Sequence, residues 1–147
     1  SPGQVVIAGD AAAVARAIDA CKAAGAKKAM ALAMSVPSHC SLLRRAVEPL
    51  REALDGVVLA EPAFPVVHNV DASVGDDLAG IRSRLLDQLY MPVRWVDCVL
   101  AMKAAGARRL LECGPGRVLS GLARRIDREL PAAPIGTVDA FDSALPA

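Results

Sequence analysis

Aromatic residues are scarce in this sequence, and this scarcity together with a nearly neutral charge excludes one large class of function. Aromatic residues make up 3% of the 147 residues, and 17 Lys and Arg are balanced by 16 Asp and Glu, for a net charge of +1. Proteins that bind nucleic acid present a basic face or an aromatic platform on which bases stack. We therefore predict no nucleic-acid partner.

Long apolar runs are also absent. The longest, residues 29–34, is far shorter than the roughly 20 residues that a membrane-spanning helix needs, so we predict no membrane partner. The first residues, Ser1-Pro2-Gly3, carry neither an initiator Met nor the charged and apolar segments of a signal peptide. We expect the chain to begin after processing or inside a longer protein.

The cysteines lack the spacing of a metal site or a disulfide framework. Cys21, Cys40, Cys98 and Cys113 are widely separated, with no C-x-x-C pair. We predict reduced thiols in a cytoplasmic protein, and no metal. Hydrophobic residues are abundant: they make up 54% of the sequence and are largely small and aliphatic. This composition suits helices packed closely on a sheet.

Alternating strand and helix patterns predict an α/β fold with a mostly parallel sheet. Ser38 is expected to cap one helix and Pro49 to kink or divide it. A division of the chain is expected near residues 35–37. Segments 57–59 and 66–70 are expected to be extended. The expected strands are 4–8, 29–36, 108–113 and 135–138, and the expected helices are 11–24, 39–54, 77–90, 92–106 and 118–130.

Two histidines are the first candidates for chemistry. His39 follows an expected strand and opens an expected helix, the position at which parallel α/β sheets bind ligands. The alternative is that His39 only helps to cap that helix. His68 lies in the pattern of a buried strand, which favours a structural role.

Other candidate motifs are weaker. The Gly114-Pro115-Gly116 turn has the strand-to-helix position of an anion-binding loop but lacks the phosphate-loop spacing, so a tight connection is favoured. No G-x-S-x-G nucleophile motif is present. Cys40 beside His39 is a poor nucleophile candidate because adjacent helical side chains diverge by about 100°. We interpret the basic residues near the last expected helix as a solvated face: Arg124, Arg125 and Arg128.

Four segments, in order along the chain, carry a resemblance to a known family. They are SPGQVVIAG at 1–9, SVPSHC at 35–40, QLYMPVRW at 88–95 and ECGPGRVLSGL at 112–122. Together they resemble the malonyl-CoA:acyl carrier protein transacylases, bacterial enzymes that load malonate for fatty acid biosynthesis. The resemblance extends over essentially the whole chain.

The resemblance implies the C-terminal part of an α/β-hydrolase-like acyltransferase fold. Residues 1–36 would be the closing β-α-β part of an inserted, small ferredoxin-like subdomain. Residues 37–147 would be the C-terminal part of the large catalytic subdomain. This agrees with the division expected from the pattern alone.

The resemblance also implies roles for individual residues. His39 matches the catalytic histidine, and the main-chain carbonyl of Gln88 would orient its imidazole. Because a carbonyl serves that purpose, Gln88→Ala should change little. Ser38 and Asn69 are the candidates for the substrate pocket, and no metal ligands are implied.

The implied function is malonyl transfer from CoA to the phosphopantetheine thiol of acyl carrier protein. No permanently bound cofactor is implied, and malonyl-CoA is the substrate. The nucleophilic serine would lie in an N-terminal portion of the enzyme, so the 147 residues alone are predicted to be inactive. Three alternatives stay open: a piece of a polyketide synthase acyltransferase domain, a non-catalytic α/β binding or scaffolding module, or a plain α/β domain whose loops bind a small anion.

Overall fold

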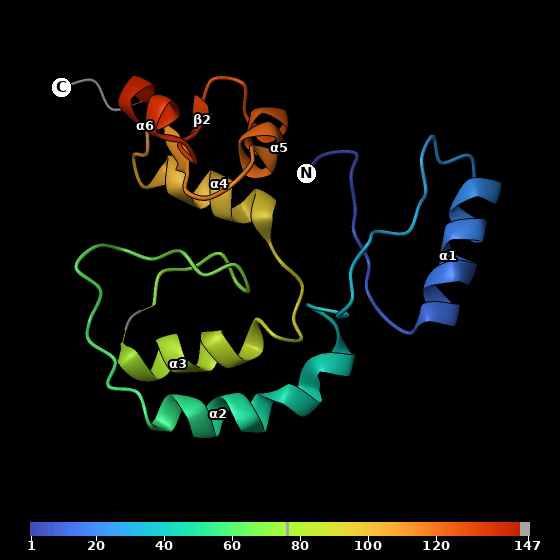
Figure 1. The fold of residues 1–147 in the computed structure, drawn as a ribbon, viewed down its shortest axis with the longest axis horizontal. Coiled ribbons are helices and arrows are strands. Elements are labelled where there is room, and N and C mark those ends of the chain that lie inside the picture. The colour runs from blue at the N-terminus through green and yellow to red at the C-terminus, as the bar shows by residue number, and fades with distance from the viewer. Residues whose placement is uncertain (76, 145–147) are drawn as a thin grey trace. The chain divides into compact units, whose positions relative to one another are not determined.

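The computed structural model describes residues 1–75 and 77–144, which form two compact units (Figure 1). The middle unit is Val6–Val93, and the terminal unit joins Ser1–Val5 to residues 94–144.

The middle unit contains helices connected by long irregular segments. Its elements are α1 (Ala11–Ala23), the 3₁₀ helix η1 (Ser41–Ala46), α2 (Val47–Asp55) and α3 (Leu78–Asp87). The terminal unit contains α4 (Trp95–Ala104), β1 (Leu110–Glu112), α5 (Val118–Ile126), β2 (Ala132–Pro134) and α6 (Val138–Ala144).

The sheet of the terminal unit is parallel, as the sequence predicts. Strand β1 pairs with β2, and Leu110 stands opposite Ala132. Helix α5 connects the two strands and packs on both, which is the usual way to join parallel neighbours. The α/β class is thus confirmed.

The core of the terminal unit is small and apolar. Val99 of α4 is fully buried, and Lys103 of α4 forms an ion pair with Asp127 at the end of α5. This pair holds α4 against the segment that follows α5. The buried core residues are Val99, Ala123, Leu130 and Ala132, with Trp95, Met102, Leu110 and Ile126 packed around them.

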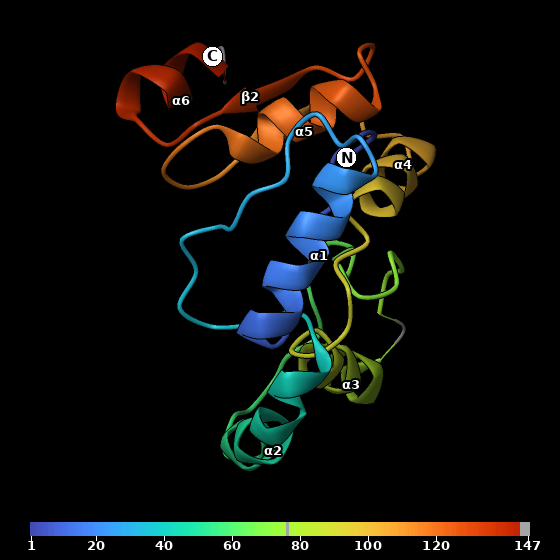
Figure 2. The ribbon, with the colours of Figure 1, turned by 90° about the vertical axis from the view of Figure 1, so that its right-hand side faces the viewer.

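The middle unit is held mainly by polar contacts. Helices α2 and α3 lie side by side (Figures 1 and 2). Arg82 of α3 donates to the carbonyls of Leu54 (2.5 Å) and Val57 (2.9 Å) at the end of α2. The Leu54 carbonyl also accepts the Val57 N–H at 3.0 Å, so the guanidinium adds a second donor at the C-terminal end of α2, where its positive charge complements the helix dipole. The buried hydrophobic residues of this unit are Val70 and Leu86.

Helix α1 begins and ends where its sequence predicts. The Asp10 carboxylate accepts hydrogen bonds from Ala12 and Ala13 N–H at the start of the helix. Gly25, with φ of 85°, closes the other end while Ala26 N–H donates to the Cys21 carbonyl. This type of C-terminal cap requires a residue with a left-handed backbone conformation, which glycine adopts without strain.

Two expected strands do not form. Residues 4–8 and 29–36 have no regular secondary structure, and 29–36 is not buried as expected. A strand needs a neighbour to accept its backbone hydrogen bonds, and none of the described segments supplies one. The apolar side chains of these segments are exposed, Val5 at 87% and Met34 at 68%. The expected β-α-β unit at the start of the chain is therefore wrong for the described structure.

The helix expected over 39–54 is divided, but not by Pro49. It begins at Ser41 as η1 and becomes α2 at Val47, so Pro49 lies in the first turn of α2, where its missing N–H has no helical partner to lose. Cys40 occupies the cap position, but its side chain makes no capping hydrogen bond to the helix. The expected Ser38 cap is therefore wrong.

The last part of the chain differs from the expected pattern in its boundaries. Strand β2 precedes the expected 135–138, and Val138 begins α6, which the sequence did not predict. Helix α4 begins at Trp95 instead of residue 92, and α5 ends at Ile126. Segments 57–59 and 66–70 lack regular pairing apart from a single antiparallel bridge between Val67 and Val74.

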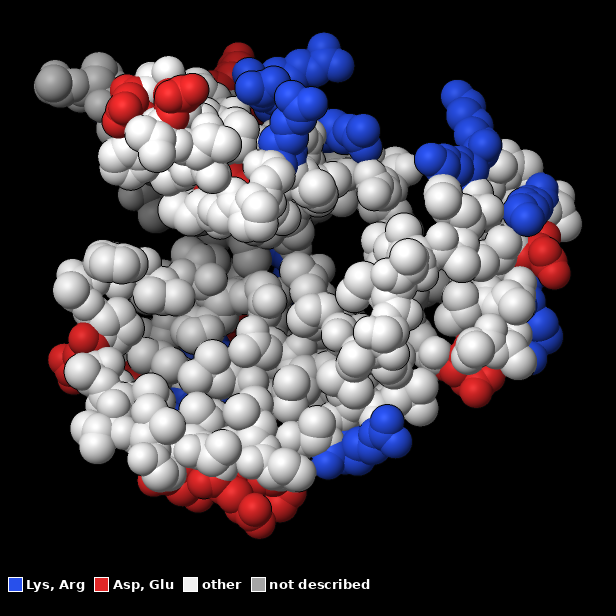
Figure 3. All heavy atoms as spheres, in the orientation of Figure 1, with Lys and Arg blue, Asp and Glu red and all other residues white. Residues whose placement is uncertain are grey.

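The surface carries separate basic and acidic groups. Figure 3 shows Lys and Arg side chains gathered over α5 and acidic side chains along α2. Arg124, Arg125 and Arg128 are exposed, which confirms the predicted solvated face. None of the described helices has both the length and the apolarity that a bilayer crossing requires.

Candidate functional site

The candidate site is centred on His39, which has an unusual backbone conformation. Its φ is 60°, in the left-handed region, which histidine tolerates better than most non-glycine residues. The His39 N–H donates to the Leu89 carbonyl at 3.0 Å. This bond ties the bend before η1 to the end of α3.

The side chain of His39 is held by the same end of α3. Its Nδ1 lies 2.7 Å from the main-chain carbonyl oxygen of Gln88, the C-terminal cap residue of α3. A carbonyl oxygen only accepts, so Nδ1 carries the hydrogen and Nε2 is left as the acceptor. The residue is exposed, so Nε2 can be reached by a reacting group.

The segment around His39 is fixed by further contacts to the residues that follow α3. Arg44 of η1 stacks over the Tyr90 ring at 4.0 Å, and the Tyr90 hydroxyl donates to Asp87 at 2.6 Å. The hydrogen bond to Asp87 raises the pKa of Tyr90. These contacts join η1, which follows His39, to the same helix end that holds its ring.

The Cys40 thiol is directed away from a Cys–His arrangement. Its Sγ donates to the Pro37 carbonyl at 3.1 Å. The geometry therefore agrees with the sequence argument against a Cys40 nucleophile. Cys21 and Cys113 are exposed free thiols.

The two predicted pocket residues lie in different segments. Ser38 is half-buried directly before His39, and Asn69 is half-buried in the turn 68–73. The structure thus brings His39 and Gln88 together, while the pocket roles of Ser38 and Asn69 stay predictions.

His68 lines a separate shallow cavity of about 290 Å³, together with Phe64 and Ile81. Burial lowers the pKa of His68, and the nearby Arg84 lowers it further. Its backbone closes the turn 68–73: His68 N–H donates to the Ser73 carbonyl at 2.8 Å. These contacts fit the structural role that the sequence favours.

Sequence reasoning missed the structural role of Glu112, which caps the start of α5. Its carboxylate accepts hydrogen bonds from Leu119 N–H (3.0 Å), Ser120 N–H (2.8 Å) and Ser120 Oγ (2.7 Å) at the start of α5. The bond from Ser120 N–H is the main reason that the pKa of Glu112 is lowered. The backbone donors of this helix start therefore already hold an anion that belongs to the chain, which favours the tight-connection interpretation over an anion-binding loop. An acidic residue at the end of the strand, just before the glycine turn, is the sequence signal that could have revealed it.

The described residues provide no metal centre. Within 1–75 and 77–144, no three His, Cys, Asp or Glu side chains are grouped closely enough to hold an ion.

Comparison with curated proteins identifies close relatives. The chain is 48% identical over 145 residues to the malonyl CoA-acyl carrier protein transacylase of Salmonella typhimurium. The matched region covers 99% of this chain and 47% of that protein. It is 38% identical over 144 residues to the enzyme of the same name from Bacillus subtilis, covering 98% of this chain and 45% of that protein. The chain is homologous to about half of a malonyl-CoA:acyl carrier protein transacylase.

Solved transacylase structures are also similar to this chain in fold and sequence. The transacylase of Xanthomonas oryzae pv. oryzae matches with a TM-score of 0.90 and 50% identity over 93% of this chain and 44% of its own. A malonyl-transacylase solved with a type II PKS acyl-carrier protein matches with a TM-score of 0.89 and 48% identity, over 93% of this chain and 44% of its own. The resemblance inferred from the four segments is thus confirmed, and the fold matches part of the transacylase fold. No family model matches the chain. The chain spans about half the length of the curated relatives it matches.

Proposed function

We propose that this chain is the histidine-bearing, C-terminal part of a malonyl-CoA:acyl carrier protein transacylase of fatty acid biosynthesis. The observation that carries the proposal is the 2.7 Å contact between His39 Nδ1 and the Gln88 carbonyl. It leaves Nε2 as an exposed proton acceptor, in a chain 48% identical to enzymes of that name.

In the first half-reaction, His39 serves as the general base. Nε2 takes the proton of a serine hydroxyl as its oxygen attacks the malonyl thioester carbonyl of malonyl-CoA. The C–S bond breaks, and the CoA sulfur takes the proton from Nε2 as it leaves. A serine with an ordinary pKa is a poor nucleophile, so this base is needed. The Gln88 carbonyl, at the negative end of α3, stabilises the imidazolium that forms between the two proton transfers.

In the second half-reaction, the thiol of the carrier protein's phosphopantetheine arm attacks the malonyl-serine ester. Nε2 takes the thiol proton and returns it to the serine oxygen as the ester bond breaks. The serine is regenerated, and no cofactor is consumed. Ser38 and Asn69 are proposed to line the pocket for the malonyl group.

The serine nucleophile is proposed to lie in the part of the relatives' length that this chain does not span. Residues 1–36 would then close a ferredoxin-like subdomain and residues 37–147 would belong to the catalytic subdomain. The exposed apolar segments 4–8 and 29–36 support this proposal, because they offer strand-forming sequence without a partner. The cytoplasm is the proposed compartment.

The test is malonyl transfer by an enzyme that joins this chain to its serine-bearing portion. His39→Ala should lower kcat by roughly 100- to 10,000-fold, the usual contribution of general base catalysis. His68→Gln, which changes the other histidine, should leave most of the rate. An unchanged kcat in His39→Ala contradicts the proposed role of His39 as the general base. The 147-residue chain alone should show no turnover, and normal turnover would contradict the half-enzyme proposal.

A second candidate differs only in the carrier. One structural neighbour was solved with a type II PKS acyl-carrier protein, so the acceptor could be a polyketide carrier. Comparing kcat/KM for a fatty acid carrier and a polyketide carrier decides between the two.

A further inference from the structure

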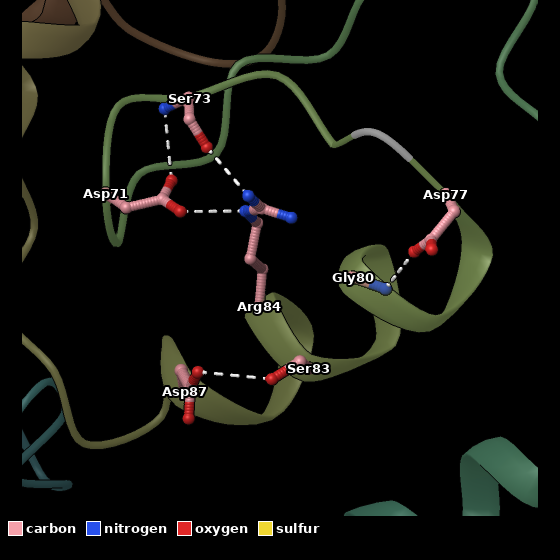
Figure 4. Close-up of polar contacts among 7 residues, drawn as sticks. All are labelled: Asp71, Ser73, Asp77, Gly80, Ser83, Arg84 and Asp87. Carbon is pink, nitrogen blue, oxygen red and sulfur yellow. Dashed lines mark hydrogen bonds and ion pairs between the residues drawn. The ribbon is translucent and has the colours of Figure 1, made fainter.

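Arg84 of α3 joins two segments of the middle unit. Its Nε lies 2.8 Å from Asp71 Oδ2, and its Nη2 donates to Ser73 Oγ at 3.0 Å (Figure 4). The Arg84 side chain is only 19% exposed, so solvent weakens this pair less than a surface ion pair. A planar guanidinium is suited to holding two acceptors at once.

The segment that Arg84 contacts is a closed turn. Ala72 N–H donates to the His68 carbonyl at 2.9 Å, with Ala72 at φ of 59°, and Ser73 N–H donates to Asp71 Oδ1 at 3.0 Å. Asp71 is thus bonded to the turn by one oxygen and to Arg84 by the other. Burial alone would raise the pKa of Asp71, but the hydrogen bonds from Arg84 and Ser73 outweigh it and lower that pKa. The same turn carries Asn69.

The other end of the connection is the histidine anchor. The Arg84 carbonyl accepts the Gln88 N–H at 3.0 Å, one helical turn further on. The Gln88 carbonyl in turn meets His39 Nδ1. Arg84 therefore stands between the turn 68–73, through its side chain, and the group that orients His39, through its backbone.

We propose that Arg84 is a positioning residue for His39. By fixing α3 to the turn 68–73, it sets the place at which the Gln88 carbonyl meets the imidazole and the distance from that ring to the segment of Asn69. This inference rests on the proposed function, because it assigns Arg84 a role in the same site.

Arg82 offers a matched control on the same helix. Its hydrogen bonds and ion pair go to Leu54, Val57 and Asp55 at the end of α2, whereas those of Arg84 go to the turn 68–73. Loss of Arg82 should loosen α2 against α3 and lower Tm, without changing the tautomer of His39.

The experiment compares Arg84→Gln, Arg84→Lys and Arg82→Gln in two measurements. Steady-state kinetics in the serine-containing enzyme should show kcat lowered about tenfold by Arg84→Gln with KM nearly unchanged, since a misplacement of about 1 Å can cost up to 100-fold. Nitrogen NMR of the His39 ring in the 147-residue chain, with His68→Gln as background, should show a smaller share of the Nδ1–H tautomer. Arg84→Lys should recover only part of both, because an ammonium cannot reproduce the forked contact.

Wild-type kcat and ring signals in Arg84→Gln overturn the proposal, as does an equal tautomer change in Arg82→Gln. If Arg84→Gln does not fold, Asp71→Asn and Ser73→Ala each weaken one contact and should give intermediate changes; wild-type behaviour in both also overturns it. The rate of His39→Ala separates failure of the proposed function from failure of the role of Arg84. A normal kcat in His39→Ala contradicts the proposed function. A low kcat in His39→Ala together with a normal kcat in Arg84→Gln contradicts only the role of Arg84.

Discussion

Different interactions stabilise the interior of each of the two units. The terminal unit has a small apolar core around Val99 and Leu130, covered by α4, α5 and the parallel pair β1–β2. The middle unit has few buried hydrophobic residues, and arginines on α3 join its segments. The candidate site lies in the middle unit.

This difference separates stability from geometry. Apolar burial stabilises strongly but has no preferred direction, whereas hydrogen bonds to guanidinium and carbonyl groups contribute modestly and fix orientation. His39 needs orientation more than burial, because its ring must present Nε2 to a reacting group. We therefore expect core substitutions to be felt mainly in the terminal unit and positioning substitutions in the middle unit.

The largest effect on stability is expected from Leu130→Ala. Leu130 is 3% exposed, and removing a buried leucine side chain lowers the free energy of unfolding by about 2–5 kcal/mol. The control is Leu32→Ala in the middle unit, where the side chain is 56% exposed and the change should stay within about 0.5 kcal/mol. Urea unfolding of the chain measures both. Equal losses in the two variants would contradict the contrast between the units.

A smaller loss is expected from Gly136→Ala in the terminal unit. A Cβ at Gly136 would collide with the Gly114 carbonyl oxygen, so the backbone must shift, which costs about 1–3 kcal/mol of stability. Gly121→Ala in α5 is the matched control, because a Cβ there meets nothing within 4 Å and alanine is the better helix former by about 0.5–1 kcal/mol. Thermal unfolding should move in opposite directions for the two. A gain in Tm for Gly136→Ala would show that the contact is not tight.

The smallest effect is a dependence on pH from Glu112. The hydrogen bonds from Ser120 and Leu119 lower the pKa of Glu112 in the folded chain. Its contribution to stability is therefore complete above the unfolded pKa of about 4.3 and is lost as the pH falls through the lowered folded pKa. The Tm difference between wild type and Glu112→Gln should be largest near neutral pH and shrink below about pH 4.3. A constant difference across that range would contradict the assignment.

Features decided by short stretches of sequence were predictable. Residues 22–26 and 103–107 share the sequence KAAGA, and both end a helix in the same way. Gly106, with φ of 96°, repeats the cap of Gly25, and Ala107 N–H donates to the Met102 carbonyl. The start of α1 at residue 11 and the stop at Gly106 agree with the expected helices 11–24 and 92–106, because capping depends on residues within one turn.

Features that depend on distant partners were not predictable. The pattern of 4–8 and 29–36 has strand propensity, but a strand forms only where another backbone accepts its bonds. The short helix α6 follows a segment whose pattern favours a strand, and Arg109 donates to the Ala144 carbonyl at its end at 2.8 Å. That contact spans 35 residues of sequence, and no local pattern encodes it.

The candidate site likewise has one part that the sequence predicted and one part that it did not. The bond between His39 and Gln88, which the family resemblance implied, is present in the structure. The left-handed backbone of His39 and the forked contact of Arg84 were not foreseen. Both arise from the packing of α3 against segments far away in sequence.

The two anchors of His39 also make the length of α3 critical. Both are main-chain carbonyls, of Gln88 and Leu89, and every amino acid supplies a carbonyl. These two contacts to His39 therefore depend on the residue at which α3 stops and not on the side chains at 88 and 89. An insertion or deletion of one residue within α3 would rotate both carbonyls away by about 100°. The length of α3 is thus itself part of the candidate site, although no side chain records it.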